Sequence, residues 1–207
     1  MTWSKIQKTA LATIAKAKIL GNTGQYGLKY HNWSHVSSMY KYLHDTKEPY
    51  DEALDWAILF HDIVYDDQPK KEYRSAVMFS DMKEKYSGCD LNVLDEGHVA
   101  ALIMSTETHS VTYSGWSAII RADLHALTDP VQTIRNFIKI MDESCQLYKT
   151  TPLNFAKSSE SFMDGLYERV LGNITSDPSH EAFYRDVLGG IRTTINLGKM
   201  IQKGNSK

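Results

Sequence analysis

Three short clusters of histidine and carboxylate residues carry the side chains best suited to chemistry. They hold His31 with His35, the adjacent pair His61 and Asp62, and Asp123 close to Arg121. Imidazole nitrogens and carboxylate oxygens are common ligands of divalent metal ions, and imidazolium and guanidinium groups bind phosphate oxygens. The residue types therefore point to a site for a metal ion, an anion or both.

The spacing within two of these clusters is informative. His31 and His35 are four residues apart, so both rings lie on one face if a helix extends back to His31. Neighbouring side chains on a helix diverge by about 100°, so His61 and Asp62 reach the same ion only when it lies in the angle between them. Such a pair suits a ligand position at the end of a helix.

Each of these residues also has a simpler interpretation. His61 follows the apolar run from Ala57 to Phe60, where a histidine is often a hydrogen-bonded core residue, and Asp62 is then only a helix-terminal carboxylate. Asp123 lies in an apolar stretch, so it must be solvated, paired with Arg121 or bound to a cation. Taken singly, these residues leave both readings open.

The apolar residues recur at helical spacing along nearly the whole chain, and no alternating strand pattern competes with them. The predicted helices cover approximately 4–20, 32–43, 51–63, 70–87, 91–106, 114–127, 130–148, 153–171 and 179–201. Ser4 is expected to cap the first helix, residues 21–30 to form a loop and residues 173–178 a turn. We therefore predict an all-α fold with one compact multi-helix domain spanning 1–207.

Composition limits the classes of function. The chain has 207 residues, 42% of them hydrophobic, and a net charge of -2, which gives no basic field for strong nucleic-acid binding. Cys89 and Cys145 cannot form a disulfide framework, no apolar run approaches the length of a membrane span, and the first residues lack a signal-type apolar stretch. We expect a cytoplasmic protein without a membrane partner.

Taken in order, five motifs resemble the HD superfamily of metal-dependent phosphohydrolases, in particular a predicted subfamily that begins with Tyr-His-Asn. The motifs are Lys29–His35, Phe60–Asp66, Glu72–Ala76, Thr106–His109 and Ala122–Leu124. They cover about residues 29–127, which would form the motif-bearing core, with the helices of 130–201 packed on it. The chain departs from the family pattern at Lys71, where many relatives have asparagine.

The resemblance implies a four-ligand site for one divalent ion: manganese, cobalt, nickel, iron, zinc or magnesium. The implied ligands are His35, His61, Asp62 and Asp123. Four protein ligands leave positions on a six-coordinate ion for water and for a phosphate oxygen. The expected reaction is hydrolysis of a phosphate ester or anhydride in a small metabolite, with a nucleotide as the leading substrate.

Other residues receive less specific roles. Asp66 or Glu72 would orient the attacking water or relay a proton, unless they form only a solvated acidic turn. His31 and His109 would donate to phosphate or hold a second ion. Lys71 and Arg74 would add positive charge that binds the phosphate of the substrate. Two alternatives remain: a di-iron oxygenase on the same scaffold, and a non-catalytic nucleotide-binding or regulatory protein. Oligomerisation is left open, because the helices after residue 130 can pack on a partner or on the core.

Overall fold

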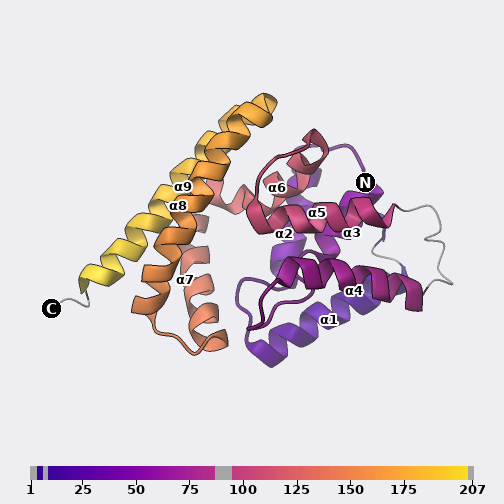
Figure 1. The fold of residues 1–207 in the computed structure, drawn as a ribbon, viewed down its shortest axis with the longest axis horizontal. Coiled ribbons are helices and arrows are strands. Elements are labelled where there is room, and N and C mark those ends of the chain that lie inside the picture. The colour runs from indigo at the N-terminus through magenta and orange to yellow at the C-terminus, as the bar shows by residue number, and fades with distance from the viewer. Residues whose placement is uncertain (1–3, 7–8, 87–94, 205–207) are drawn as a thin grey trace. The chain divides into compact units, whose positions relative to one another are not determined.

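All regular elements in the described part of the chain are helices (Figure 1). The computed structural model describes residues 4–6, 9–86 and 95–204. The predicted all-α class is confirmed. Cys89 and the beginning of the helix predicted at 91–106 lie outside the described residues.

Inter-residue contacts divide the chain into two compact units, residues 1–107 and residues 108–207. The division falls inside the segment 29–127 that carries the family-like motifs. The single domain over 1–207 therefore stays a prediction, and each unit is described by itself.

The first unit is built around a short central helix whose side chains are buried on every side. Its helices are α1 (Ala10–Tyr26), α2 (Trp33–Asp45), α3 (Glu52–Phe60), α4 (Lys71–Lys85) and α5 (Glu96–Thr108). Residues 53–60 of α3 are all buried, and α1, α2 and α4 pack against this helix. Trp56 and Phe60 of α3 and Phe79 of α4 form an aromatic cluster in the core. This hydrophobic helix therefore fixes the position of the polar residues that follow it.

The first helix begins later than predicted. The hydroxyl of Ser4 does not cap it but donates to the carboxylate of Asp55, 2.7 Å away, and the backbone N–H of Lys5 donates to the same carboxylate. Asp55 is fully buried in α3, so its charge requires such donors. Thr9 caps α1 instead.

The loop predicted at residues 21–30 is also wrong in its first part, because α1 continues to Tyr26. Gly21 and Gly24 lie inside the helix, where each costs about 1 kcal/mol relative to alanine. The buried side chain of Asn22 donates to the carbonyl oxygen of Ile63 at 2.9 Å, and this long-range bond favours the additional turns. The helix ends at Gly27, whose φ of 66° suits glycine.

Side-chain caps set most other helix starts at the predicted positions. The side chains of Asn32, Asp51, Asp129 and Thr151 accept backbone N–H groups at the starts of α2, α3, α7 and α8. These starts are confirmed.

The second unit combines three long helices with short connecting turns. Its elements are η2 (Ser114–Trp116), α6 (Ser117–Leu124), η3 (His125–Thr128), α7 (Pro130–Leu147), α8 (Pro152–Ser176), η4 (Pro178–His180) and α9 (Glu181–Gly204). Figure 1 shows α8 and α9 side by side along most of their length, and α7 packs against both. The turn predicted at 173–178 is wrong in its first part, because α8 continues to Ser176 and the buried Asn173 bonds to residues after α5.

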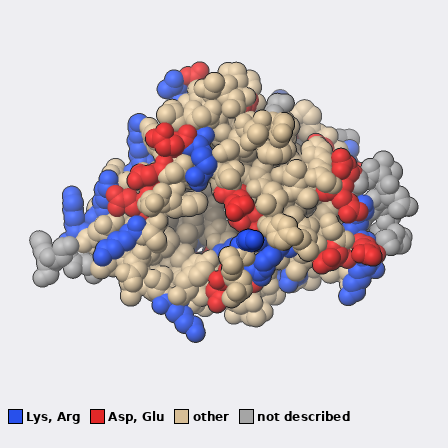
Figure 2. All heavy atoms as spheres, in the orientation of Figure 1, with Lys and Arg blue, Asp and Glu red and all other residues tan. Residues whose placement is uncertain are grey.

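Charged side chains of both signs are intermixed on the face shown in Figure 2. Among the described residues, no helix combines the length and the apolar character needed to span a bilayer.

Candidate metal centre

His35, His61 and Asp62 lie together in the first unit, although they come from two different segments. His35 is in the first turn of α2, whose start is fixed by the Asn32 cap. His61 follows the last residue of α3, and Asp62 comes next in the turn. The two histidines are buried, whereas the side chain of Asp62 is 17% exposed. The His61 and Asp62 pair therefore lies at the end of a helix, as predicted.

One potential ligand atom from each residue faces a common point. His35 Nε2 lies 3.2 Å from His61 Nε2, and Asp62 Oδ2 lies 3.1 Å from His61 Nε2 and 3.9 Å from His35 Nε2. All three atoms lie within 4.8 Å of one another. Ligands at about 2.0–2.1 Å from a metal are about 2.8–3.4 Å apart for angles between 90° and 109°. Two of the three separations fall in that range.

The tautomer of His61 strengthens the fit to a cation. His61 Nδ1 is 2.8 Å from the carbonyl oxygen of Ile58, which can only accept, so Nδ1 carries a proton. In the neutral ring Nε2 is then unprotonated, and its lone pair meets the Asp62 carboxylate at 3.1 Å. Two electron-rich atoms at that distance repel unless a cation or a proton lies between them. The donor set of two imidazole nitrogens and one carboxylate oxygen suits a transition metal ion.

The surroundings of Asp62 favour its charged form. Burial would raise the pKa of this carboxyl. When a proton lies between His61 Nε2 and Asp62, the charge and hydrogen bond of His61, with further charge from His31 and His35, lower the pKa of Asp62 well below the ordinary range. Asp62 is therefore an anion at neutral pH, as a metal ligand must be.

His31 and Lys71 lie beside this cluster and are linked through Tyr65. α2 begins at Trp33, so His31 is not on its helical face. The ring of His31 stacks on the ring of Tyr65 with centroids 3.8 Å apart, and Lys71 Nζ lies 3.7 Å from the centroid of the same ring. The ring centroids of His31 and His35 are 6.2 Å apart. Two of the predicted phosphate-binding residues thus share one aromatic contact next to the histidine pair.

Glu72 lies in the first turn of α4 and is half-buried. Burial raises the pKa of its carboxyl, and the negative charges of Asp62 and Glu107 raise it further. The proton of Glu72 is therefore held more tightly than in an exposed glutamate. A raised carboxyl pKa is a property that a general acid requires.

Asp66 and Arg74, predicted as a catalytic and a substrate-binding residue, are paired with each other. Two hydrogen bonds join the guanidinium to both carboxylate oxygens, with Arg74 Nη1 2.8 Å from Asp66 Oδ1. The hydrogen bond from Arg74 holds the pKa of Asp66 below its usual range. The role of Asp66 in moving a proton stays a prediction.

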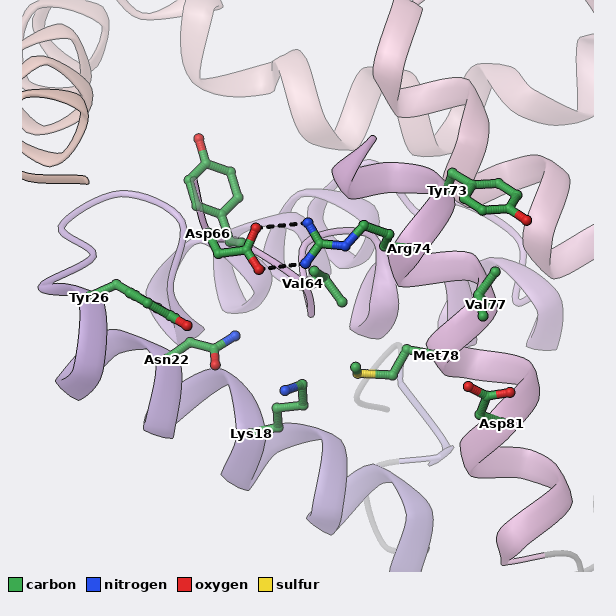
Figure 3. Close-up of a pocket in the computed structure, with 11 residues that line it drawn as sticks. Lys18, Asn22, Tyr26, Val64, Asp66, Tyr73, Arg74, Val77, Met78 and Asp81 are labelled. Carbon is green, nitrogen blue, oxygen red and sulfur yellow. Dashed lines mark hydrogen bonds and ion pairs between the residues drawn. The ribbon is translucent and has the colours of Figure 1, made fainter. Parts of the chain in front are cut away.

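This ion pair forms part of the wall of a cavity of about 380 Å³ between α1 and α4 (Figure 3). The other lining residues are Lys18, Asn22, Tyr26, Val64, Tyr65, Tyr73, Val77, Met78 and Asp81. Tyr65 therefore belongs both to the cavity wall and to the stack with His31.

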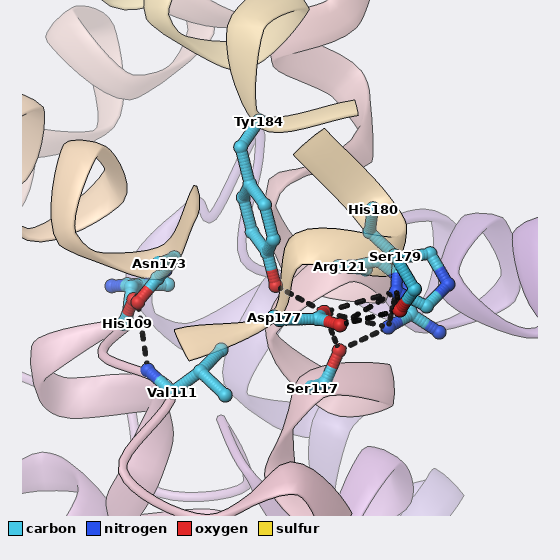
Figure 4. Close-up of polar contacts among 9 residues, drawn as sticks. All are labelled: His109, Val111, Ser117, Arg121, Asn173, Asp177, Ser179, His180 and Tyr184. Carbon is cyan, nitrogen blue, oxygen red and sulfur yellow. Dashed lines mark hydrogen bonds and ion pairs between the residues drawn. The ribbon is translucent and has the colours of Figure 1, made fainter. Parts of the chain in front are cut away.

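The remaining predicted site residues, Asp123 and His109, belong to the second unit. His109 Nε2 donates to Asp123 Oδ2 at 3.0 Å, so this histidine is a partner of Asp123. His109 has a φ of 54°, in the left-handed region. Asn173 donates to the carbonyl oxygen of His109 and accepts the N–H of Val111, which fixes this backbone conformation (Figure 4). The ligand role of Asp123 stays a prediction.

Sequence reasoning missed a buried polar network in the second unit. Arg121 Nη1 lies 3.3 Å from Asp177 Oδ2, and the guanidinium is 3% exposed. The same carboxylate also binds Ser117, Ser179, His180 and Tyr184 (Figure 4). Burial would raise the pKa of Asp177, but the hydrogen bonds from His180 and Ser117 lower it below its usual range. The only sequence signal was an arginine in an apolar helix, which required a partner.

Comparison with known proteins adds no relative. No protein-family model, no curated protein and no solved structure matches this chain.

Proposed function

We propose that the protein is a metal-dependent phosphohydrolase that cleaves a phosphate ester or anhydride of a small metabolite, with a nucleotide as the leading substrate. The observation that carries the proposal is the convergence of His35 Nε2, His61 Nε2 and Asp62 Oδ2 within 4.8 Å. The ordered resemblance to HD phosphohydrolases supports the reaction type.

In this proposal His35, His61 and Asp62 hold one divalent ion, and the Nδ1–H bond to Ile58 keeps the His61 ring in its ligating tautomer. A divalent ion bound there supplies a water of lowered pKa and takes up charge from the phosphate oxygens. Asp123, which His109 holds by a hydrogen bond, is the fourth ligand implied by the family resemblance.

The surrounding residues act on the proton and on the phosphate. Glu72 keeps its proton to higher pH than an exposed glutamate, so it can deliver that proton to the leaving oxygen. His31 and Lys71, which both contact Tyr65, are placed to donate to phosphate oxygens. Positioning and charge complementarity of this kind supply most of the catalysis in phosphoryl transfer.

Metal binding is the first test. Protein treated with a chelator is titrated with manganese, cobalt, nickel, iron, zinc and magnesium, and bound metal is measured by calorimetry and elemental analysis. We expect one ion per chain, and H61A and D62A should each weaken binding at least 100-fold while keeping the helical circular dichroism. H44A is the matched control, because the side chain of His44 is 57% exposed. D123A in the same titration tests the fourth ligand.

Turnover is the second test. Metal-loaded protein is incubated with nucleoside mono-, di-, tri- and cyclic phosphates, and phosphate release is measured. Folded, metal-loaded protein that releases no phosphate from the panel would contradict the proposal. Stabilisation by a nucleotide without product would favour a regulatory protein. Two irons per chain with consumption of dioxygen would favour an oxygenase.

A further inference from the structure

Helix α7 carries a row of apolar residues on an exposed side of the second unit. Val131, Ile134, Ile138 and Tyr148 are 57%, 40%, 49% and 46% exposed, and Met141 and Cys145 between them are half-buried. The buried residues of the helix are Thr133, Asn136, Phe137 and Glu143. In an ordinary surface helix the apolar stripe faces the core, whereas this apolar row lies on another side of the helix. An exposed apolar row of this kind marks an interaction surface.

The spacing of the row identifies the kind of surface. Its members are Val131, Ile134, Ile138, Met141, Cys145 and Tyr148, so the intervals are three, four, three, four and three residues. This is the a and d pattern of a coiled-coil seam, which accepts another helix with the same spacing. The apolar row of α7 itself has that spacing and is exposed. A second copy of α7 therefore provides the kind of helix that this seam accepts.

We propose that two copies of this chain associate through α7, with the two helices antiparallel about a two-fold axis between Ile138 and Met141. In this alignment the facing pairs are Val131 with Tyr148, Ile134 with Cys145 and Ile138 with Met141, each formed twice. Every pair combines a β-branched aliphatic side chain with an aromatic or sulfur-containing side chain, so the two rows can interdigitate. The proposal does not depend on the proposed activity.

The flanking charges select the antiparallel direction. Arg135 and Asp142 each follow a d position, Ile134 and Met141, and both occupy the e position of the heptad. In antiparallel pairs e positions face e positions, so Arg135 of one copy meets Asp142 of the other, twice across the axis. In a parallel pair Arg135 and Asp142 would face Pro130 and Phe137, which offer no complementary charge. The sequence is therefore self-complementary only in the antiparallel direction.

Sedimentation velocity over a range of protein concentrations tests the association. We expect a reversible dimer, and I138E should raise its dissociation constant at least 100-fold, because each copy would bury a glutamate carboxylate against Met141 of the other copy. Ile138 is 49% exposed, so the variant should keep the wild-type circular dichroism. K139E, at the next and exposed position of α7, is the matched control and should dimerise as the wild type does. A wild type that stays monomeric at every concentration, or an I138E variant that dimerises normally, would overturn the proposal.

A charge exchange tests the alignment. R135D should weaken the dimer about tenfold by placing like charges together, and R135D/D142R should restore it, because the pair is only inverted. Failure of the double variant to regain affinity over R135D would contradict the antiparallel pairing.

The native Cys145 provides an independent test of direction. In a C89S background, I134C should form a disulfide-linked dimer under mild oxidation, because residue 134 faces Cys145 of the other copy. Within one helix the two positions are about 16 Å apart, too far for an internal disulfide. C89S/K139C is the control and should not cross-link. Cross-linking of C89S alone would indicate a parallel pair and overturn the alignment, and a monomer with Cys145 protected from thiol reagents would overturn the dimer.

Discussion

The carboxamide of Asn22 in α1 donates to the carbonyl oxygen of Ile63, 2.9 Å away and 41 residues later in the chain. Ile63 directly follows the His61 and Asp62 pair, so this buried bond ties the turn that carries two candidate ligands to the end of a long helix. A backbone carbonyl held from outside its own turn restricts the directions that the neighbouring side chains can take. Asn22 is therefore a positioning residue for the proposed metal centre.

Replacing Asn22 by leucine should weaken both the fold and metal binding. The variant keeps the approximate volume but leaves the Ile63 carbonyl without this donor, which should cost about 1–3 kcal/mol in the free energy of unfolding. Loss of an outer hydrogen bond of this kind should raise the metal dissociation constant about 10- to 100-fold. Denaturant unfolding and metal titration measure the two effects. G21A, the exposed neighbour with no atom near its added methyl group, should bind metal normally; equal metal affinity in both variants would exclude the positioning role.

Glu72 should set the alkaline side of the pH profile. The pKa of its carboxyl is raised by burial and by the charges of Asp62 and Glu107, so the protonated, donating form persists above the ordinary range and is lost as pH rises through that pKa. E72Q should lower kcat by about 10²- to 10⁴-fold and remove this limb from the profile. E84Q, an exposed position on the same helix, is the control. An E72Q enzyme with an unchanged limb would assign the titration to another group.

Helix type and most helix starts were predictable because their signals are local. Caps at residues such as Asp51 and Asp129 lie next to the groups that they satisfy. The end of α1 was not predictable, because the glycine signal at 21–24 is overridden by the bond from Asn22 to a residue far along the chain. The same reason explains α8, whose extension past the predicted end at residue 171 depends on bonds of Asn173 to His109 and Val111.

The candidate site shows the same limit. Neighbouring ligands such as His61 and Asp62 can be recognised from adjacency, and the resemblance adds His35. The partners of the outer residues cannot be recognised from the sequence, because pairing depends on folded geometry: Arg74 binds Asp66, and Arg121 binds Asp177, which lies 56 residues later in the chain. A charged residue in an apolar helix indicates that a partner exists but does not identify it.

Asp177 should stabilise the second unit in a pH-dependent way. Its folded-state pKa is lowered by the hydrogen bonds from His180 and Ser117 despite burial, so its contribution is present above the ordinary aspartate pKa of about 3.9 and is lost as pH falls through the folded-state value. D177N leaves the buried Arg121 without its counter-charge and should lose about 3–5 kcal/mol at neutral pH. Below pH 4 the difference between variant and wild type should shrink. Urea unfolding at neutral pH and below pH 4 measures the difference in the free energy of unfolding, with D186N at an exposed position as control. A difference that is the same at both pH values would contradict the role of Asp177.

Two adjacent glycines of α9 should respond in opposite directions to the same substitution. A methyl group on Gly190 would lie 2.1 Å from the carbonyl oxygen of Leu127, a backbone atom of η3 that cannot yield as a side chain does, whereas Gly189 has no atom within 4 Å of the same position. G190A should therefore cost at least about 1–3 kcal/mol in the free energy of unfolding, because α9 must move away from η3. G189A should gain about 0.5–1 kcal/mol, because alanine restricts the unfolded chain and fits the helix. Denaturant midpoints of the two variants check this, and equal midpoints would show that α9 does not lie so close to Leu127.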